Sequence, residues 1–226
     1  MRILIVAATD AEVSVLVRKV GPGRPQQRRL AEYSYAGHDL HVLVTGVGMV
    51  ATAAWCSRTL AERSFDLALD VGLCGSFDRA LTPGRVVHVV ADCFAELGAE
   101  DGGRFLTLRE LGLEDRTDAR LGCAELRNAS PPAIVPLELL PKVRGITVNT
   151  VHGHETSIAA VVKRLQPQVE SMEGAAFMYA CLMHDVPFAQ IRAVSNVVER
   201  RNRSAWKVQE AIEAADSAAL EIVSAA

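Results

Sequence analysis

The sequence of 226 residues has few aromatic residues and no excess of charge of either sign. Phe, Trp and Tyr make up 5% of the chain, and 24 Lys and Arg are set against 27 Asp and Glu, for a formal net charge of −3. A chain with this balance has no basic surplus with which to neutralise phosphates. The composition therefore argues against a nucleic-acid partner.

Long apolar runs are also missing. The most apolar stretch near the N-terminus covers residues 3–8 and is followed by Asp10 and Glu12. A membrane-spanning helix needs about 20 apolar residues. A signal peptide needs a longer apolar region and a cleavage site of small residues. We therefore expect a cytoplasmic protein with no membrane partner.

Cysteine is scarce, and its spacing points to no bridge or metal centre. The chain has an odd number of cysteines, widely spaced and without a CxxC pair: Cys56, Cys74, Cys93, Cys123 and Cys181. Several lie in apolar sequence, where a buried thiol behaves as a small hydrophobic group. We expect neither disulfides nor a metal site.

Half of the residues are hydrophobic, which is enough for a sizeable core in a single domain over residues 1–226. Strand-like runs cover residues 1–8, 40–45, 66–71, 86–90, 146–150 and 188–195, the third of them broken at Gly72. Helical patterns cover residues 10–20, 49–63, 171–184 and 204–224, and loops are expected at 21–29 and at the proline-rich 128–141. The alternation predicts an α/β fold with a mixed, twisted sheet and helices on both faces.

Ligands of such sheets bind where strands end in glycine or small polar residues. Here those ends are Ala8-Thr9, Thr45-Gly46, the segment from Gly72 to Gly75, and Ser195-Asn196. Glu12 lies just after the first of them. A carboxylate at a strand-to-helix junction is either a general base or a helix-start charge that suits the helix dipole.

The segment Gly72-Leu73-Cys74-Gly75-Ser76 offers a second candidate contact to a ligand. Glycine lets the backbone approach a ligand closely, and backbone amides together with the Ser76 hydroxyl can donate to oxygen atoms. The alternative is a tight turn without a ligand. The spacing matches neither GxGxxG nor a P-loop, and no Lys follows, so a nucleotide phosphate site is poorly supported.

Met172 and Glu173 open a helical pattern that is otherwise almost entirely apolar. A carboxylate in such surroundings needs partners. The hydroxyl pair of a sugar is one suitable partner, since a single carboxylate accepts from both hydroxyls. The other possibility is an acidic residue of the first helical turn that is satisfied by backbone amides.

Arg192 lies in the last strand-like run, and Asn196 comes directly after it. The guanidinium of Arg192 needs a hydrogen-bond acceptor if the strand is buried. Asn196 is either a ligand contact to the edge of a heterocycle or a turn residue. His152 and His154 flank a glycine, and a loop role is favoured over metal binding because no third ligand is placed by the spacing.

Taken together, these segments resemble the nucleoside phosphorylase and nucleosidase superfamily, and within it the futalosine hydrolases. The resemblance covers nearly the whole chain. It is carried by the segments at residues 3–12, Thr45-Gly-Val-Gly48, Gly72-Leu-Cys-Gly-Ser-Phe77, Glu170-Ser-Met-Glu-Gly-Ala-Ala176, Ile191-Arg-Ala-Val-Ser-Asn196 and onward to Trp206.

The resemblance implies a nucleosidase that cleaves the N-glycosidic bond of futalosine, releases hypoxanthine and leaves dehypoxanthine futalosine, in the futalosine-dependent route to menaquinone. It also implies a homo-oligomer that needs no metal or organic cofactor. By the family's motifs, Glu12 activates the attacking water, Glu173 binds the ribose 2′ and 3′ hydroxyls, and Met172 packs on the sugar. Gly75 and Ser76 are expected at the substrate, and Arg192 is expected there too, with its role left open.

Asn196 stands where related methylthioadenosine nucleosidases have Asp, which suits a 6-aminopurine. Hypoxanthine has an oxygen at C6, which an amide can serve by donating. Asn196 therefore argues against the first alternative, a 5′-methylthioadenosine/S-adenosylhomocysteine-type nucleosidase. The second, a purine nucleoside phosphorylase, needs an anion site, but residues 7–12 and 72–76 contain no Arg. Glu12 and Glu173 argue against the third, a nucleoside-binding protein without activity.

Overall fold

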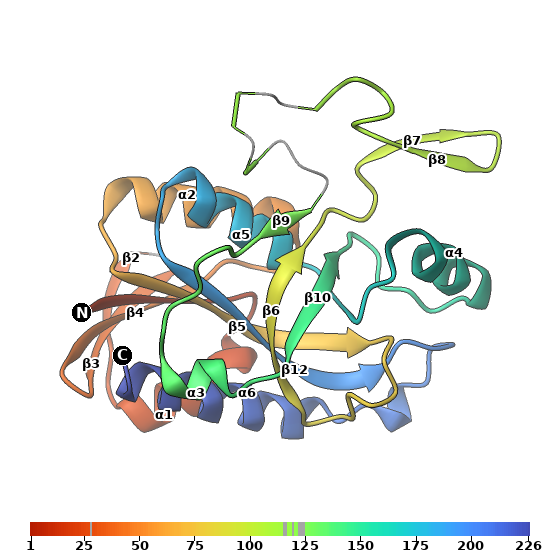
Figure 1. The fold of residues 1–226 in the computed structure, drawn as a ribbon. Helices are drawn as coiled ribbons and strands as arrows, with labels where there is room; N and C mark the ends of the chain where they lie inside the picture. Colours follow the sequence, from red (N-terminus) through yellow and green to blue (C-terminus); the bar gives the residue numbers. More distant parts are fainter. Residues whose placement is uncertain (28, 115–116, 119, 122–124) are drawn as a thin grey trace.

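The computed structural model describes residues 1–27, 29–114, 117–118, 120–121 and 125–226, and its main feature is one mixed ten-stranded sheet (Figure 1). The strands are β1 (Arg2–Ala7), β2 (Arg24–Gln27), β3 (Leu30–Tyr35), β4 (His38–Val44), β5 (Leu67–Ser76), β6 (Val86–Asp92), β9 (Leu126–Arg127), β10 (Lys142–Thr147), β11 (Val169–Ser171) and β12 (Phe188–Val197). A separate hairpin pairs β7 (Gly98–Asp101) with β8 (Arg104–Thr107).

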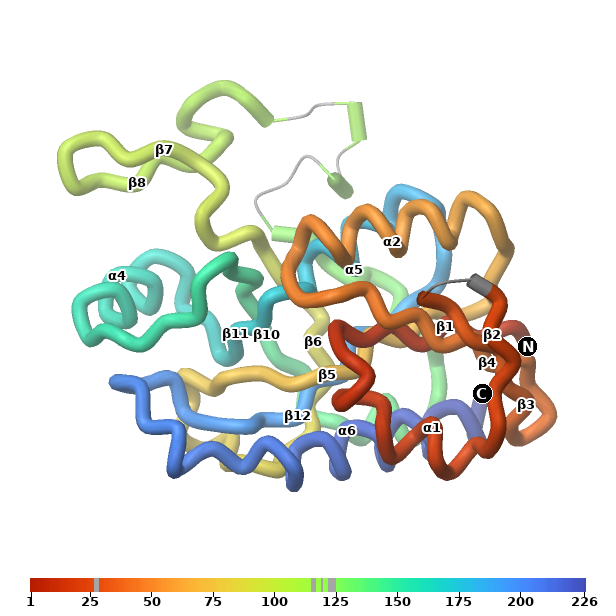
Figure 2. Tube along the Cα trace, turned by 180° about the vertical axis from the view of Figure 1, so that it is seen from behind, coloured from red at the N-terminus to blue at the C-terminus, as the bar shows by residue number. Residues whose placement is uncertain are grey.

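Helices cover both faces of the sheet, as Figures 1 and 2 show. One face carries α2 (Met49–Glu62) and α5 (Gly174–Met183), which pack on each other. The other carries α6 (Val208–Ser224), α1 (Ser14–Val20) and the short α3 (Val135–Glu138). The 3₁₀ helix η1 (Asp10–Val13) precedes α1, η2 (Arg203–Ala205) precedes α6, and α4 (Glu155–Leu165) lies near β10 and β11.

The core is divided between these two faces because successive side chains of a strand point to opposite sides. In β1, Ile3 and Ile5 belong to the apolar cluster that includes α1 and α6, whereas Leu4 and Val6 belong to the cluster that includes α2 and α5. A strand buried on both faces is apolar throughout rather than alternating. This explains why the N-terminal run is continuously hydrophobic.

Nine strands follow the order β11-β10-β6-β12-β5-β1-β4-β3-β2, and the tenth, β9, pairs with β6 beside this row. The adjacent strands β4, β1, β5 and β12 run parallel to one another, so their carboxyl ends meet at one edge. At the other end of the order β11 pairs with β5 as well as with β10, so this part of the sheet closes on itself. The closure brings the start of α5 to the same edge.

The predicted α/β class, with its mixed sheet and helices on both faces, is confirmed. The predicted break at Gly72 is wrong, because β5 continues to Ser76 in register with β12. Gly72 is there for a close approach, since a Cβ on it would overlap the guanidinium of Arg192. The loop expected at residues 21–29 is also wrong in part. It contains β2, an outer strand of the sheet, where Pro25 is tolerated.

Two further expectations are modified. The helix expected at residues 10–20 is divided into η1 and α1, and the proline-rich stretch at 128–141 contains α3. The four described cysteines are buried and free, while Cys123 lies outside the described residues. Within the described residues, no helix combines the length and the apolar character needed to cross a bilayer.

The first turn of α1 is capped from the other end of the chain. Val13 precedes this helix and has no side-chain oxygen with which to cap it. Instead Asp216 of α6 accepts hydrogen bonds at Oδ2 from the amides of Val15 and Leu16, both at 2.9 Å. Asp216 is fully buried, so its carboxylate is held by these donors and fixes α1 on α6. Because η1 leads directly into α1, the same contact supports the position of Glu12.

We expect Asp216→Ala to lower the free energy of unfolding by about 1–3 kcal/mol, because two buried amides lose their acceptor. Urea denaturation measures this change. Glu213→Ala is the matched control, since Glu213 is an exposed carboxylate on the same helix and its loss should change stability by under about 0.5 kcal/mol. Equal stability losses in the two variants would contradict the capping role of Asp216.

Candidate active site

A pocket of about 310 Å³ opens at the edge where the parallel strands end. This is within the range of small-molecule sites in proteins. Segments far apart in the sequence contribute to it: the turn after β1, the loop after β4, the end of β5, β11 with the start of α5, and the end of β12 with the start of α6. Its lining includes Thr9, Glu12, Val47, Gly75, His152, Glu170, Met172, Glu173, Asn196, Trp206 and Ile212.

Glu12 is held at the pocket by its neighbours in η1. Its Oε2 accepts from the amide of Thr9 at 2.9 Å and from the Thr9 hydroxyl at 3.0 Å, while the Thr9 hydroxyl accepts from the Glu12 amide. This is a capping box, so the helix-start reading of Glu12 also holds. The other oxygen, Oε1, lies near the Leu73 amide, at 3.4 Å. Glu12 is thus a fixed carboxylate rather than a freely rotating one.

The surroundings of Glu12 raise the pKa of its carboxyl group, which makes its carboxylate a stronger base. Burial raises the pKa of its carboxyl, and the nearby carboxylate of Glu173 raises it further, while Arg192 and Thr9 act in the opposite direction. A general base works best when its pKa approaches the working pH. The position of Glu12 therefore suits proton abstraction from a water molecule.

Glu173 lies across the same pocket and is largely buried. Its Oε1 accepts from the amide of Gly48 at 2.9 Å, and its Oε2 lies 3.2 Å from the amide of Met172. Each oxygen keeps lone pairs for further donors. A carboxylate held in this way can accept from two adjacent hydroxyl groups, and the side chain of Met172 lines the same pocket beside it.

Asn196 is oriented by a bulge in β12. Val194 pairs with Cys74 and Asn196 pairs with Gly75, so Ser195 is an extra residue between them. The Ser195 hydroxyl lies 2.8 Å from Asn196 Oδ1, and Asn196 Nδ2 donates to the carbonyl of Val197 at 3.0 Å. The amide nitrogen has a second N–H, which the pocket-lining position of Asn196 makes available to a ligand.

Two of the predicted site residues are placed behind the pocket rather than in it. The Ser76 hydroxyl is buried and bonds to the carbonyls of Asp78 and Gln168, at 2.8 and 3.3 Å. Arg192 is 1% exposed and forms an ion pair with Asp70, which is equally buried. The expectation that these two side chains contact the substrate is therefore not supported by their placement. Gly75, by contrast, lies in the pocket lining.

Arg192 acts on the site through the layer beneath it. A Cβ on Gly72 would overlap Arg192 Nη1 and would lie 3.0 Å from Glu12 Oε1, so the guanidinium and the carboxylate face the same spot. Its Nε donates to Gln190 Oε1 at 3.2 Å. Arg192 therefore supplies positive charge beneath Glu12 without occupying the pocket.

The network continues from Gln190 to the start of α5. Gln190 Nε2 donates to Asp92 at 3.1 Å, and the Thr147 hydroxyl donates to the other Asp92 oxygen at 3.0 Å. Thr147 Oγ1 in turn accepts from the Ala175 amide at 2.7 Å. Burial raises the pKa of Asp92 to about 6, and these hydrogen bonds oppose that shift. The chain of contacts links the layer beneath Glu12 to the helix that follows Glu173.

Glu170 was not predicted as a site residue, and a loop role was favoured for His152. The structure joins them, with His152 Nδ1 2.6 Å from Glu170 Oε2, and both line the pocket. His154 has a different role, because its ring nitrogen accepts from the Thr156 amide at the start of α4. The motif around Glu173 includes Glu170, and this was the signal available in the sequence.

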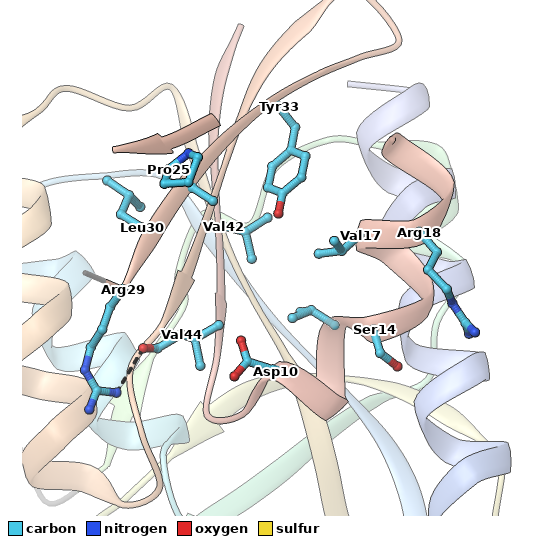
Figure 3. A pocket seen from close by; sticks show the side chains of 12 residues that line it. Asp10, Ser14, Val17, Arg18, Pro25, Arg29, Leu30, Tyr33, Val42 and Val44 are labelled. Carbon is cyan, nitrogen blue, oxygen red and sulfur yellow. Dashed lines mark hydrogen bonds between the residues drawn. The ribbon is translucent and has the colours of Figure 1, made fainter. Parts of the chain in front are cut away.

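A larger pocket of about 680 Å³ lies between η1–α1 and the strands β2 to β4 (Figure 3). Tyr33 points into it from β3, Asp10 lies at its lower end, and Arg29 is turned to the carbonyl of Val44, at 3.2 Å. This pocket offers one carboxylate, Asp10, and two arginines, Arg18 and Arg29, and its remaining lining is mostly aliphatic. The smaller pocket is the better candidate, since it brings together Glu12, Glu173 and Asn196.

We expect Arg192→Met to lower the free energy of unfolding by about 3–5 kcal/mol, because it leaves the buried carboxylate of Asp70 without its cation. Combining it with Asp70→Asn should restore part of the loss. Arg58→Met is the control, since Arg58 pairs with Glu62 on the surface, where an ion pair contributes under about 1 kcal/mol. A loss in Arg192→Met no greater than in the control, by chemical denaturation, would contradict this account.

Comparisons with known proteins find relatives over most of the chain. The family model described as the phosphorylase superfamily matches residues 2–226. The futalosine hydrolase of Streptomyces coelicolor is 31% identical over 234 residues, covering 95% of this chain and 92% of that protein. The futalosine hydrolase of Acidothermus cellulolyticus is 32% identical over 221 residues, covering 92% and 85%.

A solved structure shares the fold. It is a 5′-methylthioadenosine/S-adenosylhomocysteine nucleosidase from Colwellia psychrerythraea in complex with adenine, with a TM-score of 0.83 at 20% identity, covering 99% of this chain and 94% of that one. At this identity the likeness concerns the fold alone. The rest of the assignment depends on the pocket and on the closer relatives.

Proposed function

The chain belongs to the phosphorylase superfamily, and we propose that it is a nucleosidase that hydrolyses the N-glycosidic bond of futalosine. The products are hypoxanthine and dehypoxanthine futalosine, and the reaction belongs to the futalosine-dependent route to menaquinone. The observation that carries the proposal is the pairing of Glu12 with Glu173 across a pocket that also presents the amide of Asn196.

The reaction follows from what each group can do. The oxygen of a water molecule forms a bond to C1′ of the ribose while the C1′–N9 bond breaks, and the bonding electrons pass to the purine. Glu12 accepts the proton of the water. Glu173 and Met172 hold the sugar, and the N–H of Asn196 stabilises the negative charge that develops on the leaving purine.

Hydrolysis is favoured over phosphorolysis by the charge of the pocket. Of the described residues that line it, none is Arg or Lys, whereas Glu12, Glu170 and Glu173 are all carboxylates. Phosphate binding needs charge-assisted donors, for which arginine is the usual source. The guanidinium of Arg192 does not serve this purpose, because it is buried against Asp70. Water is therefore the better-suited nucleophile.

Purine choice separates this proposal from its nearest rival, a methylthioadenosine-type nucleosidase. Asn196 donates from an amide nitrogen, which suits the oxygen at C6 of hypoxanthine or the adjacent N7. A carboxylate there would face the C6 oxygen as a second acceptor. The same proposal includes the cytoplasmic location expected from the composition and the homo-oligomer that the family resemblance implies.

The proposal is tested by chromatography of the products formed from futalosine in phosphate-free buffer, with inosine and methylthioadenosine assayed in parallel. We expect free hypoxanthine from futalosine and no adenine from methylthioadenosine. Release of adenine would favour the methylthioadenosine-type nucleosidase. Release of a free base only after phosphate is added would favour a phosphorylase.

Replacement of the proposed base should separate chemistry from binding. We expect Glu12→Gln to lower kcat by at least about a hundredfold, in line with the usual contribution of a general base, while binding of hypoxanthine is retained. Steady-state kinetics and calorimetry measure the two effects. Asp10→Asn, which changes the neighbouring carboxylate of the same 3₁₀ helix, is the control. A kcat in Glu12→Gln within threefold of the unmodified enzyme would exclude Glu12 from this role.

Asn196→Asp should weaken the preference for a 6-oxopurine. We expect the ratio of kcat/KM for the 6-oxo nucleoside to that for its 6-amino counterpart to fall by at least about tenfold, because a donor facing O6 or N7 becomes an acceptor. Paired kinetic assays of the two nucleosides measure this ratio. If the ratio is unchanged, the amide of Asn196 does not select the base.

A further inference from the structure

The carboxylate of Glu170 is bound on both oxygens by one residue. His152 donates to Oε1 through its backbone amide at 3.1 Å, and its ring Nδ1 lies 2.6 Å from Oε2. Glu170 is 4% exposed and lies in β11, whereas His152 lies in the segment between β10 and α4. A nearly buried carboxylate that accepts two charge-assisted hydrogen bonds has a fixed orientation.

Glu170 lies close to Asn196, because both side chains border Gly75. A Cβ on Gly75 would lie 2.8 Å from Val198 Cγ2, 3.4 Å from Asn196 Nδ2 and 3.5 Å from Glu170 Cγ. Asn196 and Glu170 therefore both border Gly75, beside Val198, and a side chain at residue 75 would crowd all three. Both line the pocket that holds Glu12 and Glu173.

Glu170 has the capacity to bind a ligand as well as His152. An ionised carboxylate has about four acceptor positions, and His152 uses two of them. Burial raises the pKa of Glu170, while its contacts with His152 lower it and so favour the charged form. The mechanism proposed for bond cleavage uses Glu12, Glu173 and Asn196 and assigns no task to this third carboxylate.

We propose that Glu170 determines the specificity of the site by accepting the N1–H of hypoxanthine while the amide of Asn196 donates to O6 or N7. The donor and acceptor pattern of the base carries this inference. A 6-oxopurine has a donor at N1 next to an acceptor at C6, whereas adenine has an acceptor at N1 next to a donor at C6. Against adenine, the Glu170 carboxylate would face the lone pair of N1.

When the amide of Asn196 donates to O6, the two residues contact adjacent atoms of one edge of the base, and His152 is a positioning residue that keeps the Glu170 carboxylate oriented. The inference rests on the proposed function, because it takes hypoxanthine to be the leaving group. It adds to that function a second selecting residue on a different strand. Rejection of a ligand that leaves a buried polar group unpaired is stronger than rejection by shape alone.

The experiment measures binding of the free bases by calorimetry, without catalysis. We expect the unmodified protein to bind hypoxanthine at least about tenfold more tightly than adenine, and Glu170→Gln to reduce that preference by at least about tenfold, because an amide can donate to N1 of adenine. Glu155→Gln, an exposed carboxylate at the start of α4, is the control and should keep the preference.

A purely structural role for Glu170 would weaken both bases in proportion, and an unchanged ratio in Glu170→Gln therefore overturns the proposal. So does equal or undetectable binding of the two bases by the unmodified protein. If Glu170→Gln does not fold, 1-methylhypoxanthine replaces the variant, since its N1 has no proton to donate. Affinity equal to that of hypoxanthine overturns the proposal, and a loss of at least about tenfold supports it.

The titrations also separate this proposal from the function on which it rests. Failure of the protein to release hypoxanthine from futalosine would contradict the proposed reaction. The preference between free bases, and its dependence on Glu170, is measured in either case.

Discussion

One buried guanidinium governs the electrostatics of the site. Arg192 lies beneath the floor of the pocket, paired with Asp70 and close to Glu12, while Glu173 adds another negative charge nearby. Several carboxylates cannot remain charged in a protein interior without a compensating cation. Because Arg192 supplies that cation from below, the lining of the pocket can hold three carboxylates without an arginine or lysine of its own. The space above is left for the base and the sugar of the nucleoside and for a water molecule.

Much of this arrangement could be predicted from the sequence, since strand ends of a parallel sheet meet at one edge. Glu12, Gly75, Glu173 and Asn196 each follow or end a strand, and the structure brings them into one pocket. Ser76 does not join them, because adjacent residues of a strand point to opposite faces of the sheet. Gly75 is on the face toward the pocket, so the side chain of Ser76 is on the other face.

Other features depended on contacts between distant segments, which a single sequence does not reveal. The continuation of β5 through Gly72 follows from the guanidinium of Arg192 lying over that glycine, 120 positions later in the chain. The pairing of His152 with Glu170 depends on β11 closing the sheet against β5. The helix α4 was detectable in principle, since Ile158, Val161 and Leu165 have helical spacing, but His154 is an unusual cap.

Members of one superfamily differ in the nucleophile and in the base they accept, and here both differences follow from where charge is placed. In the function that we propose, the negative pocket favours water over phosphate, and the amide of Asn196 favours a 6-oxopurine over a 6-aminopurine. The shared fold determines where the strand ends meet. The polar side chains at those ends determine the reaction.

The proposed mechanism depends on attack at C1′ of the ribose by a water molecule that Glu12 activates. Its most direct test is cleavage of futalosine in water enriched in ¹⁸O with inorganic phosphate present, followed by mass spectrometry of the sugar product. We predict that the sugar product carries one ¹⁸O atom at C1′ and no phosphate. A sugar 1-phosphate without the label would contradict it, and would show that an anion enters the pocket despite its carboxylates.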